Sequence, residues 1–180
     1  MQNTSEQQKI LSFLDSRHDE LIDFVCELVA TPSMNPPGDE RAVADVVINK
    51  IRALGLPDTQ IVAKEKTRPN VLCRLRGSAR SPVLLYTGHI DTKPVGDEAL
   101  ADWKTDPLTP PIVDGKLYGL GSTDMKGRVA AIIYAAAALE AVSPSLRRDL
   151  LLALTADDEA AGVYGAIHLV EEHGLQADMA

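Results

Sequence analysis

The sequence has few cysteines, few aromatic residues and no excess of positive charge. Its 180 residues include two cysteines, Cys26 and Cys73, which are too few and too isolated for a disulfide scaffold or a thiolate zinc site. Aromatic residues make up 4% of the chain, so Leu, Ile, Val and Ala must fill the core. The formal net charge is -8, which disfavours non-specific attraction to nucleic acid or an anionic membrane. The expected partner is a small molecule.

Long apolar runs are also lacking. No uninterrupted apolar run reaches the roughly 18 residues that a membrane-spanning helix needs. The first ten residues, MQNTSEQQKI, contain no basic stretch followed by an apolar run, as a secretory signal would. We therefore expect a cytoplasmic protein, and the length suits one domain.

Apolar spacing predicts helices and strands that alternate along the chain. Helical spacing covers residues 5–30, as one amphipathic helix or two abutting ones, and resumes at 41–54 after a Pro-rich loop at 31–38. Short β-prone runs follow, and residues 103–118 look like an irregular excursion with short strands. This alternation predicts the α/β class, with a mixed, partly parallel sheet flanked by helices. The expected strands are 60–63, 70–75, 82–87 and 149–155, and the later helices are 126–141 and 163–173.

A histidine and an aspartate follow the apolar strand at 82–87. His89 and Asp91 are two positions apart, so their side chains point to the same side of an extended backbone. The spacing suits a carboxylate that receives the second ring N–H of a metal-bound imidazole. Taken alone, the pair is more typical of a structural hydrogen bond.

Asp124 closes a glycine-rich turn that leads into a helix. The segment Gly119-Leu120-Gly121-Ser122-Thr123-Asp124 places a carboxylate where the dinucleotide fingerprint has its third glycine, and no P-loop lysine motif exists. A carboxylate there would repel phosphate but would bind a hard or borderline cation. This disfavours a nucleotide-binding domain.

Asp157, Asp158 and Glu159 follow the apolar strand at 149–155. Such a run alone is typical of a solvated loop or a first helical turn. All three clusters, however, lie at or after an expected strand, and ligands gather outside the carboxyl ends of strands in open α/β sheets. Together they offer nitrogen and oxygen ligands with a spare carboxylate for general base work. His18, His168 and His173 have no such context.

These segments resemble a known family in their order and spacing. Gly88-His89-Ile90-Asp91, then the segment 119–127 ending in Asp124-Met125-Lys126-Gly127, then Asp157-Asp158-Glu159 resemble the three motifs of M20 metallohydrolases. That family includes acetylornithine deacetylase, succinyl-diaminopimelate desuccinylase, aminoacylase and carboxypeptidase G2-like enzymes. The middle motif is the specific one, and the helical start and Pro-rich loop also look like the family's N-terminal region.

The resemblance implies two Zn²⁺ ions, for which Co²⁺ or Mn²⁺ could substitute. His89 would bind one zinc, Asp124 would bridge both, Glu159 would bind the second, and Asp91 would support His89 as part of the catalytic machinery. The position before Glu159 normally holds a glutamate that acts as general base on a metal-bridging water, but here it is Asp158. The resemblance also implies a cis peptide bond between Asp124 and Met125.

The implied function is hydrolysis of an amide bond in an N-acyl amino acid or a small peptide, as by a deacetylase, another amidohydrolase or a metallopeptidase. Residues 1–180 would form the N-terminal part of the catalytic domain. Two further metal ligands, the C-terminal catalytic part and the lid or dimerisation domain would be absent, and the full-length protein would be a homodimer. We therefore expect little activity from the 180-residue chain alone. The alternative is a truncated, non-catalytic remnant with weak metal binding or an interaction role.

Overall fold

A four-stranded mixed sheet organises the chain. In the computed structural model, which describes residues 5–142 and 146–180, the strands lie in the order β1-β2-β6-β3. β6 pairs parallel with β3 and antiparallel with β2, and β2 pairs antiparallel with β1. The expected α/β class with a partly parallel sheet is therefore confirmed. The strands are β1 (Thr59–Val62), β2 (Asn70–Leu75), β3 (Ala79–His89) and β6 (Arg148–Thr155).

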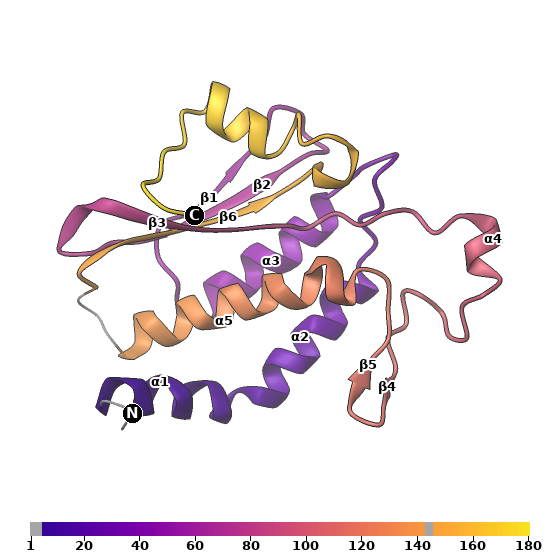
Figure 1. Ribbon diagram of the computed structural model, residues 1–180, viewed down its shortest axis with the longest axis horizontal. Helices are drawn as coiled ribbons and strands as arrows, with labels where there is room; N and C mark the ends of the chain where they lie inside the picture. The colour runs from indigo at the N-terminus through magenta and orange to yellow at the C-terminus, as the bar shows by residue number, and fades with distance from the viewer. Residues whose placement is uncertain (1–4, 143–145) are drawn as a thin grey trace.

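Four helices lie on one side of this sheet, two of them against it and the two N-terminal ones in an outer layer behind those (Figure 1). The region 5–30 forms two abutting helices that break at Arg17, whose φ of -118° is not helical. The apolar sides of the helices meet the inner face of the sheet in one core, where Leu28, Ile51 and Leu152 are fully buried. Helical periodicity located the helices within 5–30 and 41–54, of which α2 and α3 bury an apolar stripe. The helices are α1 (Ser5–Ser16), α2 (His18–Ala30), α3 (Arg41–Ala53) and α5 (Gly127–Val142).

The C-terminal segment, yellow in Figure 1, lies over the other face of the sheet. There Leu169 of the helical turn η3 (His168–Glu172) belongs to a second, small apolar cluster with Leu72 and Ala153. The helix expected over 163–173 is confirmed only in its later part. The residues before it form a turn, in which the amide of Gly162 donates to the carbonyl oxygen of Asp157 and the amide of Tyr164 donates to the Asp157 carboxylate.

An irregular excursion extends from the sheet between β3 and α5 (Figure 1). Its short strands, β4 (Ile112–Val113) and β5 (Lys116–Leu117), form a hairpin within the expected range 103–118, and the short helix α4 (Asp97–Leu100) and the wide turn η1 (Ser122–Lys126) lie on either side of that range. A further short turn, η2 (Asp158–Ala160), follows β6. Within the described ranges, no helix is long and apolar enough to cross a bilayer.

Candidate metal centre

Two parallel strands end side by side and carry candidate residues on the loops that follow them. His89, the last residue of β3, pairs in register with Thr155, the last residue of β6. The amide of Ile90 donates to the carbonyl oxygen of Thr155 at 2.9 Å, so the pairing continues one step further. Residues 89–91 and 156–159 therefore lie together at the carboxyl edge of the sheet, where ligands bind in open α/β folds.

Asp124 reaches the same edge from the N-terminal side of α5. Because α5 connects the parallel strands β3 and β6, its beginning lies near their carboxyl ends. The turn η1 holds Asp124 in a non-helical conformation (φ -124°, ψ 95°), and the Asp124–Met125 bond is cis, as the family resemblance implied. Gly121, which begins the turn, has a φ of 71°, and a Cβ there would lie 2.4 Å from Cγ2 of Thr92. Only glycine fits this position without strain.

Lys126 fastens this turn to helix α2. Its buried Nζ donates to the carbonyl oxygens of Leu28 and Thr31, each at 2.7 Å. These carbonyls lie at the C-terminal end of α2, where helix carbonyls lack partners and a cation is favoured. Burial lowers the pKa of Lys126 to about 8, although the charge of Asp91 opposes that fall. The motif at 124–127 thus supplies both a candidate ligand and its anchor.

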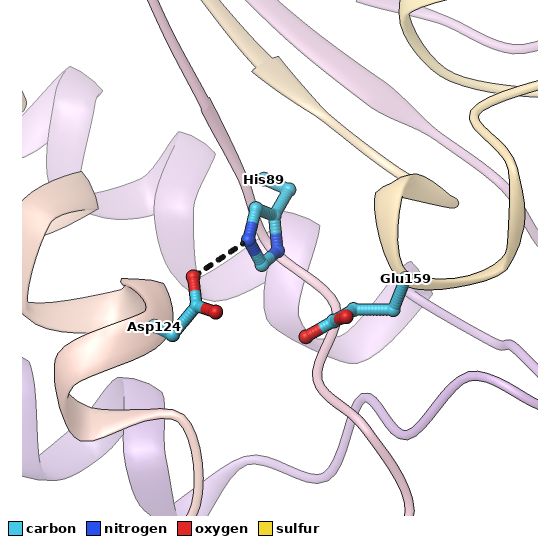
Figure 2. A group of neighbouring side chains, drawn as sticks. All are labelled: His89, Asp124 and Glu159. Atoms are coloured by element: carbon cyan, nitrogen blue, oxygen red, sulfur yellow. Dashed lines mark hydrogen bonds and ion pairs between the residues drawn. The ribbon is translucent and has the colours of Figure 1, made fainter.

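Three side chains converge at this edge, as their placement after strands predicted (Figure 2). His89, Asp124 and Glu159 each offer a ligand atom, and these atoms lie within 4.8 Å of one another. Nε2 of His89 lies 3.1 Å from Oδ1 of Asp124. The side chains of His89 and Glu159 are only 8% and 13% exposed, whereas that of Asp124 is 76% exposed. The group is therefore buried at His89 and Glu159 and open to solvent at Asp124.

The donor set fits zinc. Zinc binds imidazole nitrogen and carboxylate oxygen at about 2.0–2.2 Å, so two such ligands on one tetrahedral ion lie roughly 3.3 Å apart. The 3.1 Å between His89 and Asp124 is close to this separation. Asp124 has a second carboxylate oxygen and Glu159 is nearby, which also suits two ions about 3.5–4 Å apart that share one carboxylate. The individual ligand roles stay a prediction.

Asp91 lies behind His89 and is fully buried. Its Oδ1 lies 3.3 Å from Nδ1 of His89, and its backbone carbonyl oxygen lies 3.1 Å from the same nitrogen. The carboxylate also accepts hydrogen bonds from the backbone amides of Asp158 (3.3 Å) and Glu159 (3.0 Å). Burial raises the pKa of Asp91, but the bonds from His89, Asn35 and the Glu159 amide outweigh it and hold the pKa below its usual value. This anion favours a proton on Nδ1 and leaves Nε2 for a metal.

The same contacts change the acidity of His89. Burial lowers the pKa of His89, but hydrogen bonds to Asp91 and Asp124, together with the Asp91 charge, raise it to about 9 overall. The metal-free imidazole is therefore protonated at neutral pH. A metal that binds at Nε2 must displace that proton.

Two residues without a motif of their own also contact the site. Nζ of Lys93 lies 3.1 Å from Oε2 of Glu159 and also donates to the Glu159 carbonyl oxygen. Nδ2 of Asn35 donates to Asp91 at 2.9 Å and to Asp157 at 3.0 Å. Their only sequence signals are the position of Lys93 just after the His89-Ile90-Asp91 motif and the place of Asn35 in the Pro-rich loop.

The remaining candidates lie at the rim or elsewhere. The side chain of Asp158, the expected base, is exposed beside Glu159, and its role stays a prediction. Among the described residues, the metal-binding group does not include the other three histidines. His18 pairs with Asp19 (3.1 Å), and His168 pairs with Glu172 (3.2 Å).

Known proteins are similar to this chain in sequence and in fold. The chain is similar to a succinyl-diaminopimelate desuccinylase of Stenotrophomonas maltophilia (strain R551-3), with 34% identity over 161 residues that cover 88% of this chain and 41% of that protein. It is also similar to the crystal structure of human carnosine dipeptidase 1, with a TM-score of 0.75, 27% identity, and coverage of 92% of this chain and 37% of that one.

A third protein shares the fold. It is a dinuclear metal binding peptidase from the M20 family of Bacillus subtilis, with a TM-score of 0.62, 19% identity, and coverage of 87% of this chain and 40% of that one. The chain thus spans about two fifths of the length of these proteins. The family model for peptidase family M20/M25/M40 matches residues 85–180, which is more than half of the chain and includes all three converging side chains. This protein therefore belongs to peptidase family M20/M25/M40.

Proposed function

We propose that this protein provides the metal-binding part of a hydrolase that cleaves an amide bond in an N-acyl amino acid or a small peptide. The observation that carries the proposal is the convergence of His89, Asp124 and Glu159 within 4.8 Å in a chain of this family. In the proposed arrangement His89 would hold one zinc ion, Glu159 would hold the second, and Asp124 would contribute to both. Co²⁺ or Mn²⁺ are possible substitutes because they accept the same nitrogen and oxygen ligands.

The side chains around the site have distinct proposed roles. Bound zinc would supply Lewis acidity for the scissile carbonyl and lower the pKa of a water molecule. Asp91 orients His89 through Nδ1, so that Nε2 faces Asp124. Asp158 is the proposed general base: its carboxylate takes a proton from the attacking water and gives it to the leaving amine. Its exposed side chain and its amide, held by Asp91 at 3.3 Å, are consistent with a reactive carboxylate on a fixed backbone.

The substrate class is proposed from the family and from the shape of the site. The relatives are named as a desuccinylase and a dipeptidase, and both names describe cleavage of an amide bond beside an amino-acid portion. The open front beside the exposed Asp124 is compatible with such small substrates. Deacetylation is one member of this class.

We also propose that the chain corresponds to the N-terminal part of a catalytic domain, because its helical start and Pro-rich loop resemble the family's N-terminal region and it aligns with 41% of the desuccinylase. His89 and Asp124 give one ion two protein ligands, and Asp124 and Glu159 give the other two, whereas catalytic zinc sites usually have three plus water. The isolated 180-residue chain should therefore bind zinc weakly and turn over little substrate. A homodimeric full-length protein and a cytoplasmic location stay predictions.

The test is hydrolysis of N-succinyl and N-acetyl amino acids and of dipeptides by the full-length protein. We expect activity that a chelator removes and added zinc restores, and that Asp124→Ala abolishes while the control His168→Ala keeps it. Hydrolysis that is unaffected by complete metal removal would contradict the proposal. Weak zinc binding without hydrolysis of any of these substrates would instead identify a non-catalytic remnant.

A further inference from the structure

Arg68 lies behind residues 157–159, here called the acidic turn, although the two are far apart along the chain. We infer that Arg68 is a positioning residue for the acidic turn: it holds Asp157, and through Asn35 and Asp91 this contact fixes the backbone that presents Glu159. The value of this positioning for catalysis rests on the proposed function. The positioning itself can be measured without metal or substrate.

The guanidinium of Arg68 contacts three separate parts of the chain. Nη1 donates to Oε1 of Glu40 at 2.8 Å, and Nη2 donates to the carbonyl oxygen of Pro37 at 3.0 Å. Nη1 also lies 3.5 Å from Oδ1 of Asp157. The side chain is 10% exposed, so these contacts are largely shielded from water. Arg68 thereby joins the beginning of α3 and the Pro-rich loop to the acidic turn.

The Pro-rich loop is shaped around this guanidinium. Gly38 has a φ of 79°, and a Cβ built on it would lie 1.7 Å from Nη1 of Arg68. Only a glycine leaves this space and adopts this backbone conformation without strain. The Arg68 guanidinium carbon also lies 5.5 Å from the centre of the Tyr164 ring, within the range of a cation–π contact.

Asp157 is the residue through which Arg68 acts on the acidic turn. It has a φ of 65°, a left-handed conformation that is uncommon for residues other than glycine and that aspartate adopts more readily than most. Oδ2 accepts the amide of Tyr164 at 3.1 Å, and the carbonyl oxygen accepts the amide of Gly162 at 2.7 Å. Oδ1 faces Arg68 and accepts Nδ2 of Asn35 at 3.0 Å. The carboxylate thus fixes the chain on both sides of the turn.

Asn35 and Asp91 complete the connection to the proposed ligands. The same Nδ2 of Asn35 that contacts Asp157 donates to Oδ2 of Asp91 at 2.9 Å. Asp91 in turn accepts the amides of Asp158 and Glu159 and contacts Nδ1 of His89. A shift of Asp157 would therefore move Asn35 and, through Asp91, the proposed ligands on both strands.

Stability alone is a weak explanation for this network. Burial raises the pKa of Glu40 to about 7, even though the Arg68 guanidinium opposes the rise. The rise reflects the desolvation of the buried Glu40 carboxylate. Replacement of a buried ion pair by apolar side chains is often neutral or stabilising. A planar guanidinium, however, can donate in several fixed directions at once, which a lysine ammonium on a flexible stem does less well.

The chain offers a matched control at the other end of β6. Nη2 of Arg74 lies 2.7 Å from Oδ2 of Asp149, whose side chain is 1% exposed. Arg74, like Arg68, pairs with a buried carboxylate. Asp149, however, lies near the start of β6, whereas Asp157 lies beyond its end. Arg74→Met should therefore show how far the loss of a buried ion pair alone changes amide exchange and zinc affinity.

The experiment is amide hydrogen exchange followed by NMR in the metal-free 180-residue chain. In Arg68→Met we expect exchange of the Asp158 and Glu159 amides to accelerate by about tenfold or more, while the Leu152 amide in β6 keeps its wild-type rate. Arg74→Met should leave the two turn amides unchanged. Arg68→Lys should show an intermediate effect, and it decides the question by the same criteria if Arg68→Met does not fold.

Zinc affinity gives a second readout. Loss of a residue that orients metal ligands typically costs about 10- to 100-fold in affinity, so calorimetric zinc titration of Arg68→Met should show such a loss and Arg74→Met should not. Unchanged protection of the turn amides would overturn the inference, as would an equal acceleration at Leu152, which would indicate global destabilisation only. Absence of zinc binding by the full-length protein would overturn the proposed function, while the exchange rates still test the role of Arg68.

Discussion

The backbone amide of Glu159 donates to Oδ2 of Asp91 at 3.0 Å. Oδ1 of the same carboxylate lies 3.3 Å from Nδ1 of His89. One buried anion therefore orients proposed ligands that come from two different strands. The two proposed zinc ions should depend on Asp91 together, although Asp91 itself contacts neither ligand atom that faces the site.

Asp91→Asn should weaken the binding of both ions. The amide keeps the shape of the side chain but loses the negative charge and one acceptor oxygen, so it cannot hold His89 and the Glu159 amide equally well. We expect zinc affinity to fall by about 10- to 100-fold, measured by calorimetry. The exposed Asp102→Asn serves as control. Equal zinc affinity in Asp91→Asn and wild type would refute this role.

Zinc affinity should rise with pH up to about 9. The folded-state pKa of His89 is raised to about 9, so below that pH the ring carries a proton that zinc must displace. Each lower pH unit should then cost up to about tenfold in apparent affinity. Titrations in buffers of different ionisation enthalpy should detect one proton released per ion bound at His89. A flat pH profile between about pH 7 and 9 would contradict the assignment.

Stoichiometry should distinguish the proposed bridging ligand, Asp124, from Glu159, which is proposed to bind one ion. Asp124→Ala removes the carboxylate shared by both ions and should abolish measurable binding, because each ion would keep one protein ligand. Glu159→Ala should leave one weak ion held by His89 and Asp124, whose ligand atoms are 3.1 Å apart. Metal content after equilibrium dialysis against zinc measures both. Two ions retained in Asp124→Ala would show that Asp124 does not bridge.

The sequence predicted the three side chains that converge better than the residues that position them. Apolar runs predicted β3 and β6, and the parallel pairing of His89 with Thr155 makes residues that follow the two strands meet. A continuous apolar run predicts a strand that is buried on both faces, as β6 is from Asp149 to Thr155. Arg68 and Lys93 gave no such signal, since a charged side chain in a loop is compatible with many contacts. Their partners are set by how the loops at 31–38 and 156–164 fold over the sheet edge.

Gly121→Ala should lower the zinc affinity, beyond any loss of folding stability. Its φ is 71°, and the new Cβ would lie 2.4 Å from Cγ2 of Thr92, so the turn that presents Asp124 must shift. Gly55→Ala is a matched control, because Gly55 has a φ of 74° with no neighbour within 4 Å. Both variants should lose about 1–2 kcal/mol of unfolding free energy from backbone strain, and Gly121→Ala should lose more because of the contact with Thr92, as measured with urea. Only Gly121→Ala should also lose zinc affinity, and equal affinities in the two variants would contradict the prediction.

Asp158→Glu should increase turnover of the full-length protein. Asp158 occupies the position before Glu159 where the family resemblance implies a glutamate, and aspartate is one methylene shorter. A displacement of about 1 Å in a reacting group can cost on the order of 100-fold in rate, so the longer side chain should bring the carboxylate nearer to the attacking water. Because the Asp158 side chain is exposed, the extra methylene meets little steric resistance.

Asp158→Ala tests the same role from the other direction. It should lower kcat by roughly 100- to 10,000-fold, the usual contribution of general acid–base catalysis, with KM and zinc content nearly unchanged, because the Asp158 amide that Asp91 accepts remains in the alanine variant. Steady-state kinetics on an N-acyl amino acid, with metal content measured in parallel, separate loss of the base from loss of metal. Wild-type turnover in Asp158→Ala would exclude it as the base and direct attention to Asp157, whose carboxylate is held by Asn35 and the Tyr164 amide.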